Sequence, residues 1–365
     1  MKFKLLMTLM VAAFYSVAVG SAPADRLERS PRTASFDARH ELKVFVPEGA
    51  QRVRVWLAMP QDDPFQVVRG FKVQSPAPYR ITTDSENNRM IYVELLKPAQ
   101  KEVTVIQTFS LRRREQLSKA HAAKARNITE DDRRKYAAYL APNQNVTITD
   151  TVRSLAKEIV GGEQNPVRAA RKLYDWVLAN IDHWVKDPKN KAASLVGSTD
   201  YCLQTKTGNC TDFHSLFTSL ARASGIPTRM VYGSFFKTEL DGHNVDQGYH
   251  CWPEFYAPNI GWVPHDVAVA DIFADDFKIT TENEKLVRLL TADGYRGPDK
   301  SMIDYYFGNL DERRVTFSRG RDLTLSPKQD GGPVNALAKA YVEVDGNVQP
   351  EKTGWVRKLT FTEDR

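Results

Sequence analysis

The residues of this chain best suited to covalent chemistry are Cys210, His250 and Asp266. Cys210 follows Gly208-Asn209 and precedes an apolar stripe of helical spacing, a pattern that predicts a helix beginning at the cysteine. In the first turn of a helix, the dipole and the unpaired backbone N–H groups lower the pKa of a thiol and can bind an oxyanion. Cys210 is therefore a candidate nucleophile, although a free cysteine is just as often a small buried hydrophobe.

A nucleophilic thiol needs a base within hydrogen-bond reach, and the base needs a third group to orient it. His250 lies in a predicted strand and Asp266 follows a hairpin-like turn at 258–261, so adjacent antiparallel strands would bring the two together. Glu254, on the same face of the predicted strand as His250, is the alternative orienting acid. The histidines that compete for the role of base are His214, His243 and His265. His214 could face the thiol from the same helix, but no acid on another strand is its obvious partner.

The nucleophile must be positioned by helices, and three helical patterns are present. Residues 150–160 and 166–181 each follow a capping residue, and the second pattern has proline at its first position. The third helix has Asn209 as its N-cap, with Asp212 placed to reach back to the cap backbone. Residues 185–208, which are polar and contain glycine, are predicted to be a loop leading to this helix.

Alternation of polar and apolar residues predicts antiparallel strands on both sides of the helices. The runs before the helices are 41–46, 52–57, 90–95 and 103–109. The runs after the nucleophile helix are 228–232, 250–256, 262–263, 314–318, 322–325 and 340–344. Short strands separated by turns predict a small β-sandwich over residues 35–111. Helices followed by an antiparallel sheet indicate an α+β core.

Residues 1–20 have a positive start, an apolar run and small residues before a cleavage site after Gly20, as in a secretory signal peptide. The run is shorter than the ~20 residues of a spanning helix. We therefore expect a secreted or periplasmic protein with no stable membrane insertion after cleavage. The other predicted segments are a flexible lead-in over 21–34, the sandwich over 35–111, a charged helical connector over 112–146, a core with a C-terminal strand extension over 147–348, and a tail over 349–365.

Composition excludes several classes of protein. Hydrophobic residues make up 42% of the chain and charged residues 26%, as in ordinary globular domains. A formal net charge of +6 is too small and too dispersed for a nucleic-acid-binding protein. We interpret the basic run at 112–114 as part of a solvated connector. Three cysteines are too few for a disulfide scaffold and lack the spacing of zinc ligands, so we predict no metal and no cofactor.

Three motifs together resemble the core of the transglutaminase-like superfamily. The run Gly208–Arg229 is similar to the nucleophile helix of that family, Tyr249–Tyr256 to its histidine strand and Gly261–Asp266 to its acid-bearing strand. The resemblance implies a papain-like arrangement of helices on an antiparallel sheet. It also implies that the three residues named at the outset form a Cys-His-Asp catalytic triad. The N-terminal strands resemble the β-domain that often precedes this core in secreted bacterial members.

Three side chains are candidates for stabilising the oxyanion. In papain-like peptidases the Cys and His lie about 130–150 residues apart and the third partner is Asn, so the shorter separation and the Asp found here do not fit. Gln204 nevertheless precedes Cys210 where such enzymes keep an oxyanion glutamine. Tyr201 and Trp262 are the other candidates, and all three could instead serve packing or loop hydrogen bonding.

The two remaining cysteines could form a disulfide in an oxidising compartment. Cys251 neighbours the candidate base and Cys202 shortly precedes the nucleophile, so both could lie near the site. A Cys202–Cys251 bridge is therefore one hypothesis, whereas a bridge from Cys202 to Cys210 would inactivate the thiol. Either bridge would require a Cα separation of about 4.4–6.8 Å.

The resemblance implies a secreted thiol enzyme acting on amide bonds of a protein or peptide substrate. Cys210 would attack the carbonyl, and His250 would take the thiol proton and then protonate the leaving amine. The thioester would pass to an amine, as in a transglutaminase, or to water, as in an amidase or peptidase. The alternative is a non-catalytic transglutaminase-fold module that binds partners or supports structure in the cell envelope, because fold does not fix function.

Overall fold

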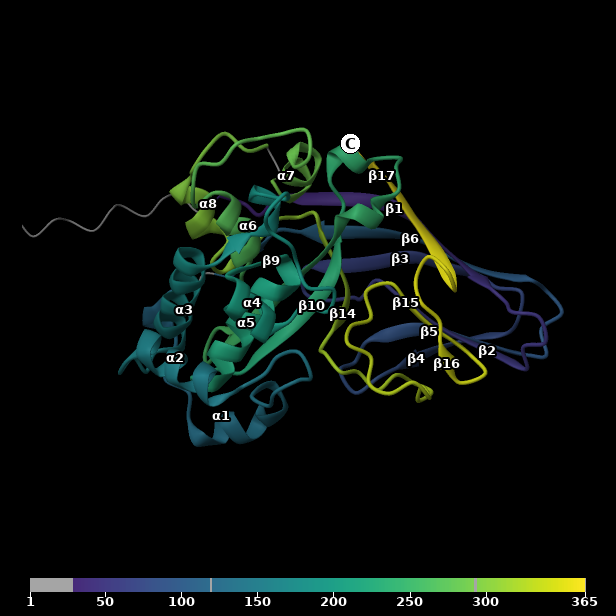
Figure 1. Cartoon of the computed structure of the whole chain (residues 1–365), viewed down its shortest axis with the longest axis horizontal. Coiled ribbons are helices and arrows are strands. Elements are labelled where there is room, and N and C mark those ends of the chain that lie inside the picture. Colours follow the sequence, from purple (N-terminus) through teal and green to yellow (C-terminus); the bar gives the residue numbers. More distant parts are fainter. Residues whose placement is uncertain (1–28, 119, 292–293, 365) are drawn as a thin grey trace, which may run out of the picture. The chain divides into compact units, whose positions relative to one another are not determined.

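The computed structural model describes residues 29–118, 120–291 and 294–364. The predicted signal peptide over 1–20 and most of the predicted lead-in lie outside these residues. Residues from Pro31 onward form one compact unit of mixed α+β architecture, in which antiparallel sheets precede a helical core (Figure 1). The α+β class expected from the sequence is confirmed. Among the described helices, none has the length and apolar character needed to cross a membrane.

Two antiparallel sheets enclose a hydrophobic core and form a β-sandwich (Figure 1). The first sheet has the order β17 (Trp355–Asp364), β1 (Thr33–Phe45), β6 (Glu102–Arg114) and β3 (Gln66–Gln74). The second has the order β16 (Asn347–Val348), β15 (Ala340–Val344), β2 (Arg52–Ala58), β5 (Arg89–Leu96) and β4 (Tyr79–Thr83). Alternate side chains of both sheets, such as Leu42, Val55 and Val105, are fully buried between them, as period-two alternation requires.

The C-terminal strands belong to this sandwich, which the sequence analysis did not predict. The segment interpreted as a tail over 349–365 contains β17, which pairs along β1 from Ser35↔Asp364 to Val44↔Trp355. Its inward side chains alternate as strictly as those of β1. The strand predicted over 322–325 is not formed, because Asp322 adopts a positive φ of 53° and only one isolated bridge follows it.

The predicted connector over 112–146 also differs from expectation. Strand β6 continues through Arg114, and β7 (Gln116–Leu117) pairs with β13 (Asn309–Leu310). The helical pieces are η1 (Ala122–Lys124), α1 (Glu130–Lys135) and η2 (Ala137–Tyr139). Arg113 is buried, and its guanidinium lies 3.2 Å from the Asp63 carboxylate. The basic run therefore is not a solvated connector, because alternation in β6 turns its middle residue inward.

The helices predicted before the nucleophile are confirmed. Helices α2 (Asp150–Val160) and α3 (Pro166–Asn180) begin at Thr149 and Asn165, whose side chains accept first-turn N–H groups. The segment predicted as a loop over 185–208 instead contains a short helix, α4 (Thr199–Thr205). This seven-residue helix is largely polar, and its sequence has no apolar stripe that would reveal it.

Helix α5 (Cys210–Ala223) packs on a four-stranded sheet that forms the centre of the core (Figure 1). The sheet has the order β12 (Gly261–Pro264), β11 (Tyr249–Ala257), β10 (Thr228–Phe235) and β14 (Arg314–Arg319). Val315 and Phe317 of β14 join the apolar cluster of the sandwich. The other short elements are β8 (Asp182–His183), η3 (Trp184–Lys186), β9 (Thr207–Gly208), η4 (Thr238–Leu240), η5 (Val245–Gly248), α6 (Val267–Ile272), α7 (Glu284–Leu290) and α8 (Lys300–Tyr305).

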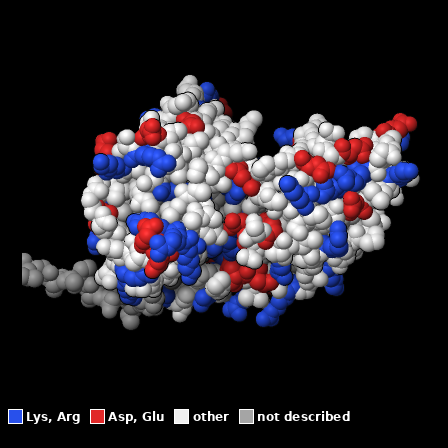
Figure 2. Space-filling view, turned by 90° about the horizontal axis from the view of Figure 1, so that it is seen from below, with Lys and Arg blue, Asp and Glu red and all other residues white. Residues whose placement is uncertain are grey.

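The charged surface is mixed in sign. On the face shown in Figure 2, Lys and Arg side chains are interspersed with Asp and Glu. Most ion pairs involve partly exposed side chains, such as Arg171 with Asp175 at 2.8 Å. Such pairs contribute little to stability, roughly 0–1 kcal/mol each. This face therefore offers no extended basic field of the kind that binds a nucleic acid backbone.

Candidate active site

Cys210 lies at the N-terminus of α5, held there by a capping box. The Asn209 side chain accepts the N–H groups of Thr211 at 2.9 Å and Asp212 at 3.3 Å, and the Asp212 carboxylate accepts the N–H of Asn209 at 3.0 Å. Cys210 itself is 8% exposed. Among the described residues, its own backbone N–H has no hydrogen-bond acceptor. That N–H group is available to bind an oxyanion next to the thiol.

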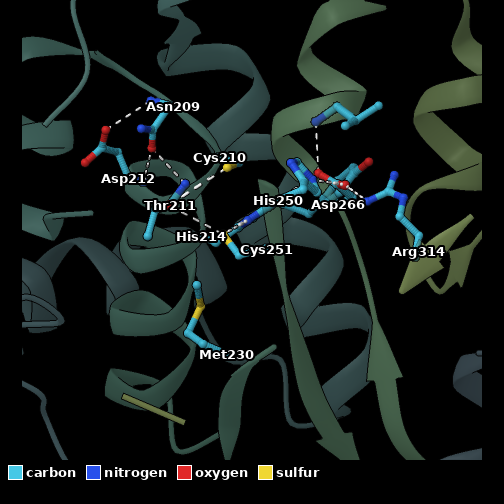
Figure 3. Close-up of polar contacts among 12 residues, drawn as sticks. Asn209, Cys210, Thr211, Asp212, His214, Met230, His250, Cys251, Asp266 and Arg314 are labelled. Carbon is cyan, nitrogen blue, oxygen red and sulfur yellow. Dashed lines mark hydrogen bonds and ion pairs between the residues drawn. The ribbon is translucent and has the colours of Figure 1, made fainter. Parts of the chain in front are cut away.

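His250 and Asp266 meet in the structure. His250 comes from β11, and Asp266 is the N-cap of α6 directly after β12. The Nε2 atom of His250 lies 2.7 Å from Oδ2 of Asp266, while Oδ1 of Asp266 accepts the N–H of Val269 at 3.0 Å. In Figure 3, His250 lies between Cys210 and Asp266. Because Nε2 is occupied by the carboxylate, Nδ1 is the nitrogen available to the thiol.

The electrostatics of this group favour a charged pair. A hydrogen bond from the Cys251 thiol and the charge of His250 hold the pKa of Cys210 well below its ordinary value, against the effect of burial. Burial alone would lower the pKa of His250, but the charges of Asp266 and Cys210 outweigh it and raise that pKa. The site therefore favours a thiolate beside an imidazolium, which is the reactive form of a cysteine nucleophile.

Two further side chains, those of Arg314 and His214, lie close to the Asp266 carboxylate. Sequence reasoning did not predict either contact. Arg314 of β14 is fully buried and donates to Oδ2 of Asp266 through Nη1 and to Asp311 through Nε at 2.8 Å (Figure 3). Nε2 of His214 lies 3.3 Å from Oδ1, without the alignment of a hydrogen bond. Although burial opposes ionisation, the charges of His250 and Arg314 hold the pKa of Asp266 well below its ordinary value.

A glycine lets Arg314 reach this position. A Cβ atom added at Gly233 of β10 would lie 1.9 Å from the carbonyl oxygen of Val315, so only glycine permits the close approach of β14. Gly233 pairs with His250 on its other side. Arg314 begins a predicted strand, whereas Gly233 lies one residue beyond the strand predicted over 228–232, and no local signal indicated that the two segments are neighbours.

The three cysteines are free thiols, so the Cys202–Cys251 disulfide considered from the sequence is not formed. The Cys251 Sγ atom contacts α5 instead, lying 3.4 Å from Nδ1 of His214 and 3.7 Å from Oγ1 of Thr211. The same Thr211 hydroxyl lies 3.8 Å from Sγ of Cys210 (Figure 3). Cys202 is buried on α4, and burial raises the pKa of its thiol.

The three side chains predicted as oxyanion candidates have other surroundings. Gln204 is exposed on α4. The Tyr201 hydroxyl donates to the carbonyl of Ala192 at 2.9 Å. The Trp262 ring lies under the Arg229 guanidinium, 4.2 Å from its centroid, within a cluster of tyrosines. No interaction of these three with the nucleophile is recorded among the described residues, which leaves the N-terminus of α5 as the better source of donors.

The competing acid and bases are mostly occupied elsewhere. Glu254 forms an ion pair with Arg229, whose Nη2 lies 2.7 Å from Oε2. His243 is exposed, and its Nδ1 lies 2.8 Å from a backbone carbonyl. His265 is buried with its ring centroid 3.8 Å from that of Phe217. Among these rivals, His214 is the one whose ring nitrogen lies within 4 Å of the Asp266 carboxylate in the described residues, at 3.3 Å.

His183 is a further residue near the nucleophile that the sequence analysis did not single out. It lies on β8, which pairs in parallel with β9 so that His183 is opposite Gly208. Its Nδ1 atom accepts the N–H of Val185 at 3.3 Å, which places the proton of the neutral ring on Nε2. Burial lowers the pKa of His183 to about 3, with opposing contributions from Cys210 and His250. Its ring is therefore a neutral neighbour of the charged pair.

One acidic group in the described residues has the spacing of metal ligands. Carboxylate oxygens of Asp182, Asp271 and Asp275 lie within 4.8 Å of one another. The Lys186 ammonium, however, lies 2.9 Å from Asp271, 3.2 Å from Asp275 and 3.7 Å from Asp182. The lysine already supplies the positive charge that a cation would bring, so this cluster is an internal ion-pair network.

Comparison with known proteins agrees with this architecture. Residues 153–267, which include all three candidate catalytic residues, match the core domain model of the transglutaminase-like superfamily. The chain is 27% identical over 330 residues to an uncharacterized protein of Haemophilus influenzae, covering 83% of this chain and 84% of that one. It is 28% identical over 129 residues to an uncharacterized Bacillus subtilis protein, covering 32% and 17% of the two chains.

A similar fold is found in the crystal structure of a candidate cysteine protease from Cytophaga hutchinsonii. The TM-score is 0.56, the sequence identity is 13%, and the similarity covers 92% of each chain. At that identity the likeness concerns the fold alone. The transglutaminase-like, papain-like fold expected from the three sequence motifs is thereby confirmed.

Proposed function

We propose that this protein is a thiol enzyme that transfers acyl groups from amide bonds of polypeptides. Cys210 is the nucleophile, His250 the base and acid, and Asp266 the group that orients the histidine. The observation that carries the proposal is a thiol at a helix N-terminus beside a histidine whose far nitrogen is 2.7 Å from a buried carboxylate. That constellation is suited to nucleophilic catalysis and serves no evident purpose in packing.

In the first half of the reaction, the Cys210 thiolate attacks the carbonyl carbon of the amide. The oxyanion that forms lies near the unpaired N–H of Cys210 at the start of α5. The imidazolium of His250 then gives its proton to the departing amine, and the C–N bond breaks to leave a thioester on the cysteine. In the second half, His250 removes a proton from water or from an acceptor amine, which attacks the thioester and releases the thiolate.

Arg314 supports this cycle without contacting the reacting atoms. Its guanidinium pairs with the same Asp266 oxygen as the histidine, Oδ2, and keeps the carboxylate ionised. A fixed carboxylate holds the His250 ring with Nδ1 toward the thiol. We also propose that the enzyme acts outside the cytoplasm, on the basis of the sequence of residues 1–20.

The test is the pH dependence of iodoacetamide labelling at Cys210, mapped by mass spectrometry in wild type and His250→Ala. We expect the Cys210 thiol to titrate well below the free-thiol pKa of about 8.5. Loss of the neighbouring imidazolium should raise that pKa in the variant. Cys202, whose thiol is buried on α4, is the internal control in the same digest.

Slow labelling with an ordinary pKa in both proteins would remove Cys210 from any reaction. The alternative hypothesis, a non-catalytic binding or structural module, would then replace the enzyme hypothesis. Products of a glutamine-containing peptide, with and without an added primary amine, would separate transfer from hydrolysis once the thiol is shown to be reactive.

A further inference from the structure

The loop formed by residues 192–198, called here the 192–198 loop, is attached directly to the N-terminus of α5. The N–H of Ser194 donates to Oδ2 of Asp212 at 3.1 Å, and the N–H of Ser198 donates to Oδ1 at 2.9 Å. The Ser194 hydroxyl also donates to this carboxylate. The same carboxylate caps Asn209, the residue before the nucleophile. One buried acid therefore fixes both the loop and the helix start.

A second set of contacts fixes the other half of the loop. A Cβ at Gly197 would lie 2.1 Å from the Thr211 side chain, so the loop backbone packs against the residue that follows Cys210. The Gly197 carbonyl accepts from the Ser215 hydroxyl and from Nη1 of Arg321, both at 2.9 Å. Nη2 of Arg321 donates to the Val196 carbonyl at 2.7 Å. This backbone is therefore held by several contacts against the residue that follows the nucleophile.

Two adjacent side chains at the centre of this loop are apolar and exposed. Leu195 is exposed to 102% of its reference area and Val196 to 44%. Among the described residues, the N–H and C=O groups of Leu195 have no hydrogen-bond partner. Single exposed apolar residues are ordinary on protein surfaces. Here, however, two exposed apolar residues are adjacent, and the backbone groups of Leu195 are free. Both residues lie directly before Gly197, which packs against Thr211 in the first turn of the nucleophile helix.

We propose that the 192–198 loop is the substrate-recognition edge of the thiol site, an inference that rests on the proposed function. Leu195 and Val196 contact an apolar side chain of a polypeptide acyl donor, close to the carbonyl that Cys210 attacks. The free N–H and C=O of Leu195 pair with the backbone of that extended segment. The preferred substrates are then polypeptides with an apolar residue near the attacked amide, rather than small free amides.

The test compares two alkylating probes of Cys210 that differ in what they offer the loop. One is iodoacetamide, which has no side chain to bind. The other is a peptidyl chloromethyl ketone, made in two forms that carry Leu or Gly next to the reacting residue. The variant is Leu195→Ser. The matched control is Leu96→Ser, which alters a 72% exposed leucine at the end of β5 in the sandwich.

We expect wild type and Leu96→Ser to react about 10-fold or more faster with the Leu probe than with the Gly probe, as one apolar contact permits. Leu195→Ser should lose most of that preference while its iodoacetamide rate stays unchanged. If Leu195→Ser keeps the preference, or if wild type has none, the inference is overturned and the thiol chemistry stands. An inert thiol toward all probes would overturn the proposed function itself.

Discussion

The starts of helices α5 and α6 each hold a buried carboxylate, and the two carboxylates have opposite kinds of partner. Within the described residues, Asp212 at the start of α5 accepts only from neutral groups, namely the N–H groups of the cap and the 192–198 loop and a serine hydroxyl. Asp266 at the start of α6 faces His250 and Arg314. Burial raises the pKa of Asp212, whereas the two cations hold the pKa of Asp266 well below its usual range.

This difference separates the scaffold of the site from its chemistry. The Asp212 carboxylate is satisfied by neutral donors, fixes backbone and forms no ion pair among the described residues. A carboxylate shared by a histidine and an arginine sets the charge of the histidine that faces the thiol. Substitutions at the two helix starts should therefore differ in whether they change the rate, although both should lower stability.

The largest effect on rate is expected for Cys210→Ala. Turnover should be abolished because no other thiol faces His250 in the same way. The free energy of unfolding should change little, since alanine is a good helix former and the cap is left intact. Activity assays and urea unfolding on the same preparation would show this. Retained turnover would remove Cys210 from the mechanism.

The next largest loss is expected for His250→Ala, about 10²–10⁴-fold in kcat/KM, the usual contribution of a general base. His214→Ala is the matched control, because His214 also lies near Asp266 but contacts Cys251. We expect a smaller loss for the control. If His214→Ala loses more activity than His250→Ala, the roles of the two histidines must be exchanged.

Asp266→Asn should lose less rate than His250→Ala, because it removes the orienting group but not the base. It should also lower the free energy of unfolding by about 3–5 kcal/mol, since the buried Arg314 keeps only Asp311 as a charged partner. Steady-state kinetics and denaturant titration measure the two effects separately. A wholly silent variant would assign the orienting role to another acid.

Asp212→Asn should have the smallest effect on chemistry. It removes acceptors from the cap and from the 192–198 loop, at a cost of about 1–2 kcal/mol in stability. The pKa of Cys210, measured by labelling, should stay close to that of wild type. A shift as large as that in Asp266→Asn would contradict the distinction between the two helix starts.

Lowering the pH should change the stability contributions of Asp266 and Asp212 in opposite directions. The folded-state pKa of Asp266 is lowered, so its stabilisation is present above the unfolded pKa of about 3.9 and is lost as pH falls toward the folded value. The stability advantage of wild type over Asp266→Asn should therefore shrink below about pH 4. The pKa of Asp212 is raised, so wild type should gain stability relative to Asp212→Asn as pH falls through that value. Unfolding titrations at several pH values would show both trends.

Sequence reasoning succeeded where the determinants are local. The capping box at Asn209, the caps of α2 and α3, and the alternation of β1 and β2 all depend on residues close along the chain. The pairing of His250 with Asp266 was predictable because a short hairpin-like turn separates their strands. The helix caps and strands follow from propensity and periodicity, whereas the choice of His250 and Asp266 over their rivals rested on the resemblance of the three motifs.

Sequence reasoning failed where segments that are distant along the chain come into contact. That Arg314 and His214 converge on Asp266 depends on which strands are neighbours, and nothing near either residue indicates it. The burial of Arg113 likewise depends on Asp63 in another segment. Helix α4 was missed because its polar residues carry no periodic signal. One of its contacts, from Thr199 to Ser219, is with the distant helix α5.

The pairing of β17 with β1 has a consequence for how the protein is made. The first and last strands of the described chain are adjacent, and the whole thiol core lies between them in the sequence. The sandwich cannot be completed until residues 340–364 have been synthesised, because β15 and β17 each supply a strand to one of its two sheets. Contacts of such high sequence separation form slowly. The segment carrying the nucleophile is thus complete in sequence before its neighbouring sandwich can close, and a chain interrupted before Trp355 would leave β1 with an unpaired edge.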